Sequence, residues 1–211
     1  MNRPFLKSQV KFETFFCNYF EWLPENSDTK VYVGILKNEF PSIDDMVYLK
    51  NDFEIGRSIA SAGILKSLEM VRTDDGFMIY KEYFNGIPLE KYLLSKEFSI
   101  PLFLQLAIRL TKLLKTLHNN KLIIKEFTLE NILVSPETLE MRICSLGSAS
   151  RLNRERLEFG SEFVYYGPLW HIAPEQTGRI GRTVDYRADY YSLGVMRSEE
   201  RRVGKECSLP C

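Results

Sequence analysis

The chain has 211 residues, in which 28 lysine and arginine residues balance 28 aspartate and glutamate residues. This balance gives no argument for a nucleic acid or an anionic membrane as a partner, and we expect neither. No apolar run reaches the ~18 residues that a membrane-spanning helix needs, and residues 1–7 lack the apolar core of a signal peptide. Four cysteines without metal or disulfide spacing suggest a reducing environment. We therefore expect a cytoplasmic protein that does not span a membrane.

The first part of the sequence predicts short strands and one helix. Aromatic residues before the turn at 24–28 predict two short strands around a hairpin. Residues 31–37 are β-branched and apolar, which is typical of a strand. Ser42 is placed to cap a helix that extends to about residue 60, because apolar residues recur there at helical spacing.

The rest of the sequence predicts more strands and then mainly helices. In chain order, we expect strands over 66–72 and 77–82 joined by the turn Thr73–Gly76, a short helix over 89–94, a longer helix capped by Ser99 and closed near His118, and a strand, a turn and a strand before residue 145. Such an order of elements indicates a mixed α and β domain.

Four motifs occur in a fixed order after the long helix. They are the polar loop Ile124–Asn131, the tripeptide Ser145-Leu146-Gly147, Ala173-Pro174-Glu175, and Asp189-Tyr190-Tyr191-Ser192-Leu193-Gly194. This set resembles the catalytic core of the protein-kinase family, in which the loop carries His-Arg-Asp and a later Asn, and the tripeptide is Asp-Phe-Gly. The resemblance covers roughly residues 30–196.

The resemblance implies an α+β, two-lobed protein-kinase-like fold. The small β-rich lobe would comprise residues 1–84, and an incomplete, mainly helical large lobe would comprise residues 85–196. Residues 197–211 lack the apolar helical pattern of that lobe, and we expect them to be a tail foreign to the domain, with a solvated charged helix as the alternative.

In active kinases the loop Asp orients the substrate hydroxyl, a loop Lys neutralises the γ-phosphate, and the Asn and the Asp of Asp-Phe-Gly hold Mg²⁺. The resemblance places Glu126, Thr128, Asn131 and Ser145 at these four positions. Glu126 is one methylene longer, Thr128 removes a charge, and Ser145 offers a neutral hydroxyl where Mg²⁺ prefers an anionic oxygen. Asn131 and Ser145 are thus a poor pair of Mg²⁺ ligands, and we expect Asn131 to brace the loop.

The kinase resemblance also implies a phosphate site in the small lobe. No glycine precedes Gly34, so the first hairpin cannot be the glycine-rich cradle of a kinase. The strand Lys of the Val-Ala-Ile-Lys pattern is replaced by Gly34 in the favoured alignment, and is Lys37 in the alternative one. Glu54 is the first candidate for the helix acid that pairs with this Lys, and Asp52 is its rival.

The resemblance also assigns positions to five other residues. Glu82 and Phe84 lie in the hinge between the lobes, whose backbone binds the adenine of ATP in kinases. Glu175 is the residue that pairs with an arginine late in the large lobe, and Asp189 would bond to the backbone of the catalytic loop. Pro168 replaces a threonine that contacts this loop, and it lacks an N–H group.

Residues 174–179, followed by 185–187, restrict the resemblance to one group of kinase-like domains. They are similar to the N-terminal kinase-like domain of large bacterial signalling proteins, in which an ATPase-type module, a GAF sensor and a histidine kinase are the attached partners. We therefore expect a catalytically impaired, regulatory kinase-like module with weak or Mg²⁺-independent ATP binding. The alternatives are a divergent active Ser/Thr kinase that uses Lys37 and Glu126 to transfer the γ-phosphate of ATP to protein, and a gene fragment without a function.

Overall fold

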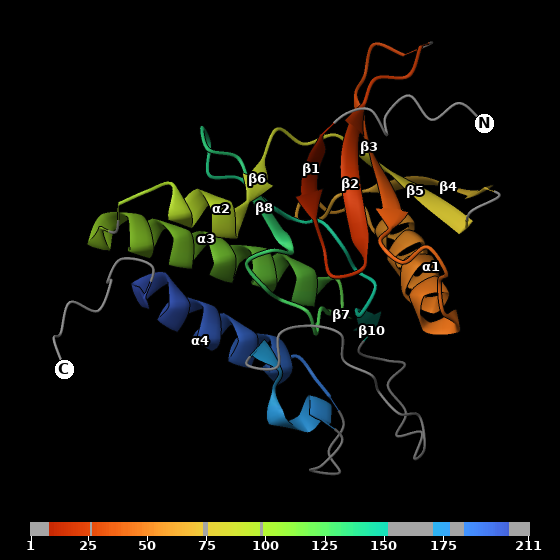
Figure 1. Ribbon diagram of the computed structural model, residues 1–211. Coiled ribbons are helices and arrows are strands. Elements are labelled where there is room, and N and C mark those ends of the chain that lie inside the picture. The colour runs from red at the N-terminus through yellow and green to blue at the C-terminus, as the bar shows by residue number, and fades with distance from the viewer. Residues whose placement is uncertain are drawn as a thin grey trace, which may run out of the picture.

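The computed structural model describes residues 9–25, 27–73, 76–97, 99–151, 171–177 and 184–202 (Figure 1). Its strands are β1 (Val10–Glu13), β2 (Cys17–Trp22), β3 (Val31–Leu36), β4 (Ser67–Thr73), β5 (Gly76–Glu82), β6 (Ile87–Pro88), β7 (Leu122–Ile123), β8 (Ile132–Val134), β9 (Met141–Ile143) and β10 (Ser150–Arg151). Its helices are α1 (Ile43–Ser58), α2 (Leu89–Leu94), α3 (Ile100–Asn119) and α4 (Arg187–Arg202), with a 3-10 helix at Pro174–Thr177.

The small lobe is an antiparallel sheet with one helix packed against it. Its five strands lie in the order β1-β2-β3-β5-β4, and α1 lies beside β4 and β5 (Figure 1). Helix α1 begins after Ser42, whose hydroxyl accepts a hydrogen bond from the backbone N–H of Asp45, while the Asp45 carboxylate accepts one from the backbone N–H of Ser42. This capping box satisfies two donors that would otherwise lack partners at the helix start.

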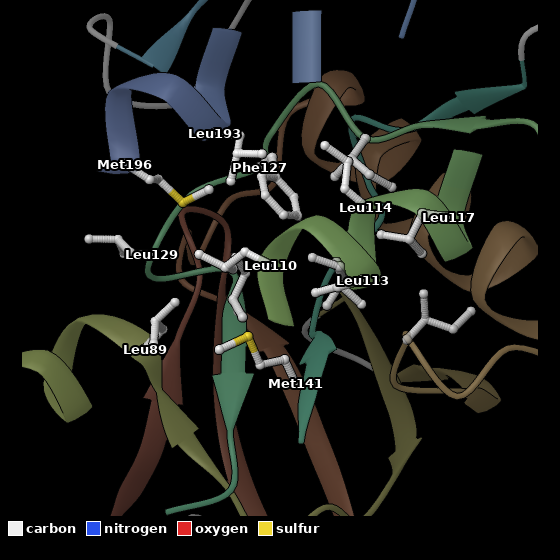
Figure 2. Packing of buried hydrophobic residues seen from close by; sticks show 14 of the residues in the cluster. Leu89, Leu110, Leu113, Leu114, Leu117, Phe127, Leu129, Met141, Leu193 and Met196 are labelled. Atoms are coloured by element: carbon white, nitrogen blue, oxygen red, sulfur yellow. The ribbon is translucent and has the colours of Figure 1, made fainter. Parts of the chain in front are cut away.

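The large lobe is built around α3. Its apolar stripe contains Leu106, Leu110, Leu113, Leu114 and Leu117, all of them buried. Figure 2 shows this stripe packed with Phe127 of the polar loop and with Leu193 and Met196 of α4. The small sheet β6-β8-β9 carries the polar loop at one end, since β8 begins directly after Asn131. Packing of α3 therefore holds the loop that the sequence identifies as the candidate site.

The α+β fold predicted from the sequence is confirmed, and the strands and helices expected up to residue 145 are all present. Helix α4 continues to Arg202, so it crosses residue 197, where we predicted the apolar helical pattern to stop and a tail to begin. Several predictions fall outside the described residues: Asp74 and Asp75 of the turn, Pro168, Cys207 and Cys211, and the absence of a signal peptide in residues 1–7. In the described part of the chain, no helix is long and apolar enough to cross a membrane.

Candidate functional site

The side chain of Asp189 holds the polar loop after α3 through hydrogen bonds with the loop backbone. This carboxylate is fully buried, and it accepts hydrogen bonds from the backbone N–H groups of Ile124 (3.0 Å) and Lys125 (2.8 Å). The Nε2 atom of His118 lies 2.8 Å from the same carboxylate. Asp189 thus makes the backbone contact that the kinase resemblance implies, and His118 joins it from the end of α3.

Gln176, which belongs to the motif at residues 174–179, also holds this loop, although the sequence assigned it no such contact. Its side-chain amide donates to the carbonyl of Lys125 at 3.1 Å, and its Oε1 accepts the N–H of Ala173 at 3.1 Å. Lys125 has a φ of +63°, a conformation that non-glycine residues seldom adopt and that surrounding contacts must impose. Glu175, beside Gln176, is half-buried.

Glu126, the residue at the catalytic base position, is bound by its own chain. Its Oε2 accepts hydrogen bonds from the hydroxyl of Tyr48 on α1 at 2.8 Å and from the hydroxyl of Ser148 at 3.1 Å. Burial raises the pKa of this carboxyl to about 7, although the two hydrogen bonds act in the opposite direction. Both hydrogen bonds fall on Oε2, so contacts within the chain fix the orientation of this carboxyl.

Ser145 is bound to the same tyrosine. Its Oγ lies 3.0 Å from the hydroxyl of Tyr48, so Tyr48 joins the base position to the position of the metal-binding Asp. Gly147 lies against the Tyr48 ring, and a Cβ atom there would come within 2.4 Å of ring carbons. Helix α1 therefore holds both substituted positions of the site.

Asn131 holds the loop through hydrogen bonds of both its side-chain nitrogen and its side-chain oxygen. Its Nδ2 donates to the carbonyls of Glu126 (3.1 Å) and Ser145 (2.9 Å), and its Oδ1 accepts the N–H of Ser145 at 2.9 Å. The thiol of Cys144 also lies 3.0 Å from this oxygen. The amide is therefore occupied by backbone contacts, as expected for a bracing residue.

The site residues do not fit a magnesium ion. Mg²⁺ is usually held by one or two carboxylates together with substrate phosphates, in near-ideal octahedral geometry. Asn131 and Ser145 are neutral, buried and already hydrogen-bonded to the chain. Across the described ranges, no group of three His, Cys, Asp or Glu side chains is placed to hold a metal.

The small lobe does contain a buried lysine–acid pair, but not the expected one. The Nζ of Lys81, at the end of β5, lies 2.8 Å from Oδ1 of Asp52 on α1, and both side chains are inaccessible to solvent. Lys81 also donates to the carbonyl of Cys144 at 2.7 Å, and Asp52 accepts the N–H of Leu146 at 2.7 Å. The pair thus ties α1 and β5 to the segment that follows β9.

Lys37, the lysine of the alternative alignment, and Glu54, the first candidate for the helix acid, are not brought together. Lys37 forms an ion pair with Glu13 at 2.7 Å, and Glu54 lies 3.8 Å from Lys50 one turn earlier on α1. The side chains of Glu54 and Lys50 are both more than 60% exposed. The position of the helix acid is filled by Asp52, which we had ranked second.

The Val-Ala-Ile-Lys alignment that favours Gly34 agrees with the packing of β3. Gly34 pairs with Tyr19 across the sheet, and a Cβ atom at Gly34 would come within 2.6 Å of the Tyr19 ring and 2.8 Å of Ile79. The space that a side chain of β3 would take is therefore filled by Tyr19. Lys81 lies opposite Tyr32 on the neighbouring strand and supplies the cation from there.

The hinge residues also contact the chain itself. The carbonyl of Phe84 accepts the hydroxyl of Tyr32 at 2.6 Å and the N–H of Gly86 at 2.8 Å. The Glu82 carboxylate accepts hydrogen bonds from Arg142 (2.8 Å) and from the backbone N–H of Lys66 (3.1 Å). The sequence identified Glu82 and Phe84 as the hinge but did not indicate these internal partners.

A cleft of about 340 Å³ lies beside the polar loop. It is lined by Glu13, Thr14, Phe15, Lys37, Pro88, Glu90, Lys91, Glu126, Thr128, Glu130 and Asn131. Its four carboxylates outnumber its two lysines, and Thr128 stands where a kinase has a cation. Such a lining is unfavourable for a triphosphate, because like charges would face each other at short range.

Residues 27–200 match the family model described as the protein kinase domain. Over 172 residues the chain is 26% identical to a probable serine/threonine-protein kinase of Clostridium perfringens, covering 80% of this chain and 24% of that protein. Over 181 residues it is 25% identical to the serine/threonine-protein kinase ppk25 of Schizosaccharomyces pombe, covering 79% of this chain and 41% of that protein.

A third relative is a histidine kinase. The peroxide stress-activated histidine kinase mak2 of Schizosaccharomyces pombe is 31% identical over 108 residues, which cover 46% of this chain and 4% of that protein. This chain thus spans less than half the length of each of these relatives. The family match extends over most of the chain and includes the loop, the hinge and both lobes, so the chain belongs to the protein kinase family.

Proposed function

We propose that the chain is a pseudokinase module, a protein-kinase-like domain that regulates other signalling domains and does not transfer phosphate. The observation that carries this proposal is the pair of hydrogen bonds from Tyr48 to Glu126 and Ser145. Through these two bonds, Tyr48 of helix α1 occupies the base position and the metal position at the same time.

Loss of charge supports the same conclusion. In kinases the lysine of the loop and the metal ions neutralise charge on the transferring phosphoryl group, and such electrostatic stabilisation is usually the largest catalytic contribution. Thr128 and Ser145 are both neutral here, and both are buried. Within the described ranges, Glu126 and Asp52 are two acids whose hydrogen-bond networks reach Ser145 or its neighbour Leu146, and each already has a partner.

The contacts that the chain retains support a function that depends on the shape of the domain and not on catalysis. Asp189, Asn131 and Gln176 hold the loop through its backbone, and Asp52 with Lys81 holds α1 against the segment after β9. A domain held in this way presents a fixed kinase-like surface without nucleotide. Partners that recognise such a surface would be attached signalling domains or other proteins, and the match to a histidine kinase in a much longer protein is in keeping with that context.

One observation favours the second candidate function, a divergent active Ser/Thr kinase. Lys81 and Asp52 rebuild a buried lysine–acid pair from a different strand. In kinases such a pair must be formed for activity. Here, however, the Nζ of Lys81 is used by Asp52 and by the carbonyl of Cys144, and its side chain is fully buried, so it does not reach the open cleft.

The proposal is tested by measuring phosphoryl transfer directly. The chain is incubated with γ-labelled ATP and either Mg²⁺ or Mn²⁺, and label is counted on the chain itself and on an added Ser/Thr protein substrate. We expect wild type and Glu126→Ala to give the same background, because both lack the metal-binding Asp, which is Ser145 here, and the loop lysine, which is Thr128. Metal-dependent labelling by the wild type that Glu126→Ala abolishes would instead establish the active kinase.

A further inference from the structure

Aromatic side chains of the small lobe fill the space between the sheet and the hinge. Phe12, Tyr19 and Tyr32, from three neighbouring strands, are completely buried. The ring of Phe12 stacks on Tyr19, with centroids 4.6 Å apart and planes 13° apart, and meets Tyr32 edge-on at 5.0 Å. These rings belong to one core cluster with Phe84 of the hinge and Leu133 of β8.

One of these side chains, Tyr32, is hydrogen-bonded to the hinge. The Tyr32 hydroxyl donates to the Phe84 carbonyl at 2.6 Å, and the N–H of Gly86 is turned back onto the same carbonyl. Both acceptor positions of the Phe84 carbonyl are therefore filled from within the chain. A ligand that displaced Tyr32 would have to break this buried hydrogen bond, which costs free energy.

The sequence shows why the rings are accommodated. In the alignment that places Gly34 at the lysine of Val-Ala-Ile-Lys, Tyr32 stands at the small Ala of that pattern, and Gly34 leaves room for the Tyr19 ring. Protein interiors are packed to crystal-like density, so a position filled by a tyrosine ring does not also admit a purine. The open cleft is lined neither by Tyr32 nor by Phe84 or Leu133, which places it outside this cluster.

We infer that Tyr32, together with Phe12, is an internal substitute for the nucleotide base, which closes the hinge pocket and keeps the domain in its folded shape without ATP. The inference rests on the proposed function, since it explains how a pseudokinase module maintains a kinase-like shape. The inference concerns binding of the nucleotide base, whereas the proposed function concerns transfer of phosphate, so different measurements test the two.

Adenosine, which carries the base and the ribose but no phosphate, is the probe. Its binding to the whole chain is measured by saturation-transfer NMR and by titration calorimetry, for wild type, Tyr32→Ala and Tyr32→Phe. The matched control is Tyr80→Ala, which removes a tyrosine ring from β5 on the opposite face of the same sheet, where Tyr80 packs near Trp22. Melting curves verify that each variant is folded.

Wild type, Tyr32→Phe and Tyr80→Ala are expected to show no saturable binding, whereas Tyr32→Ala gains affinity for adenosine by about tenfold or more. Saturable binding by the wild type, or a folded Tyr32→Ala that binds no better than Tyr80→Ala, would overturn the inference. If Tyr32→Ala does not fold, Phe12→Ala opens the same cluster from β1 and is held to the same two outcomes. A wild type that binds no adenosine but transfers phosphate would refute the proposed function alone.

Discussion

Replacing Lys81 by methionine is expected to destabilise the chain by about 3–5 kcal/mol, because it leaves the Asp52 carboxylate buried without its cation. The Tyr19 hydroxyl and the backbone N–H of Leu146 remain as partners of Asp52, but neither carries a charge. Urea unfolding followed by circular dichroism measures the loss.

Lys37→Met is the matched control for this experiment. Lys37 forms an ion pair of similar length, 2.7 Å, but its side chain is 37% exposed and that of Glu13 is 57% exposed. Exposed pairs contribute about 0–1 kcal/mol, so the control should unfold close to the wild-type midpoint. Equal effects of the two substitutions would show that Lys81 is not the cation of the small lobe.

The second large effect is on the pH dependence of stability, and Glu126 causes it. Its carboxyl has a pKa of about 7 in the folded chain, against the ordinary value of 4.5. The folded chain therefore keeps a proton that the unfolded chain releases, so the free energy of unfolding falls as pH rises from about 4.5 to about 7 and then stays level. Because protonation of Glu126 is linked to folding, the total loss in the free energy of unfolding is on the order of 3 kcal/mol.

Glu126→Gln should remove this loss, since glutamine cannot ionise but can still accept the hydrogen bond from Tyr48. At pH 8 the variant is expected to be more stable than wild type by up to about 3 kcal/mol, and near pH 4.5 the two should be equal. Glu54→Gln, on the exposed face of α1, is the control and should show no pH-dependent difference. A constant difference between Glu126→Gln and wild type at all pH values would contradict the raised pKa.

The fold was predictable because local patterns and global packing agree in this chain. Ser42 and Ser99 cap their helices as their positions indicated, and the leucine stripe of α3 forms the core of the large lobe. The kinase motifs then supplied the order of the two lobes. Glu54 is the longer acid, but Asp52 is the buried one, and burial decides which of them pairs with Lys81.

The partners of the site were harder to predict, because they come from distant parts of the sequence. Tyr48 and Glu126 are 78 residues apart, and Tyr32 and Phe84 are 52 residues apart, so no local motif connects them. Lys81 did carry a signal. It follows Phe77 and Ile79 in the alternation of β5, which places it on the inward face, where a lysine requires a buried partner.

The central claim is that the chain's own side chains, and not a nucleotide, complete this kinase fold. Melting of the wild-type chain with and without ATP and Mg²⁺ tests it most directly. A ligand present at a hundred times its Kd stabilises a folded protein by about 2.7 kcal/mol, which is readily seen as a shift in Tm. We predict the same Tm in both conditions, and a rise in Tm that requires both ATP and Mg²⁺ would contradict the account.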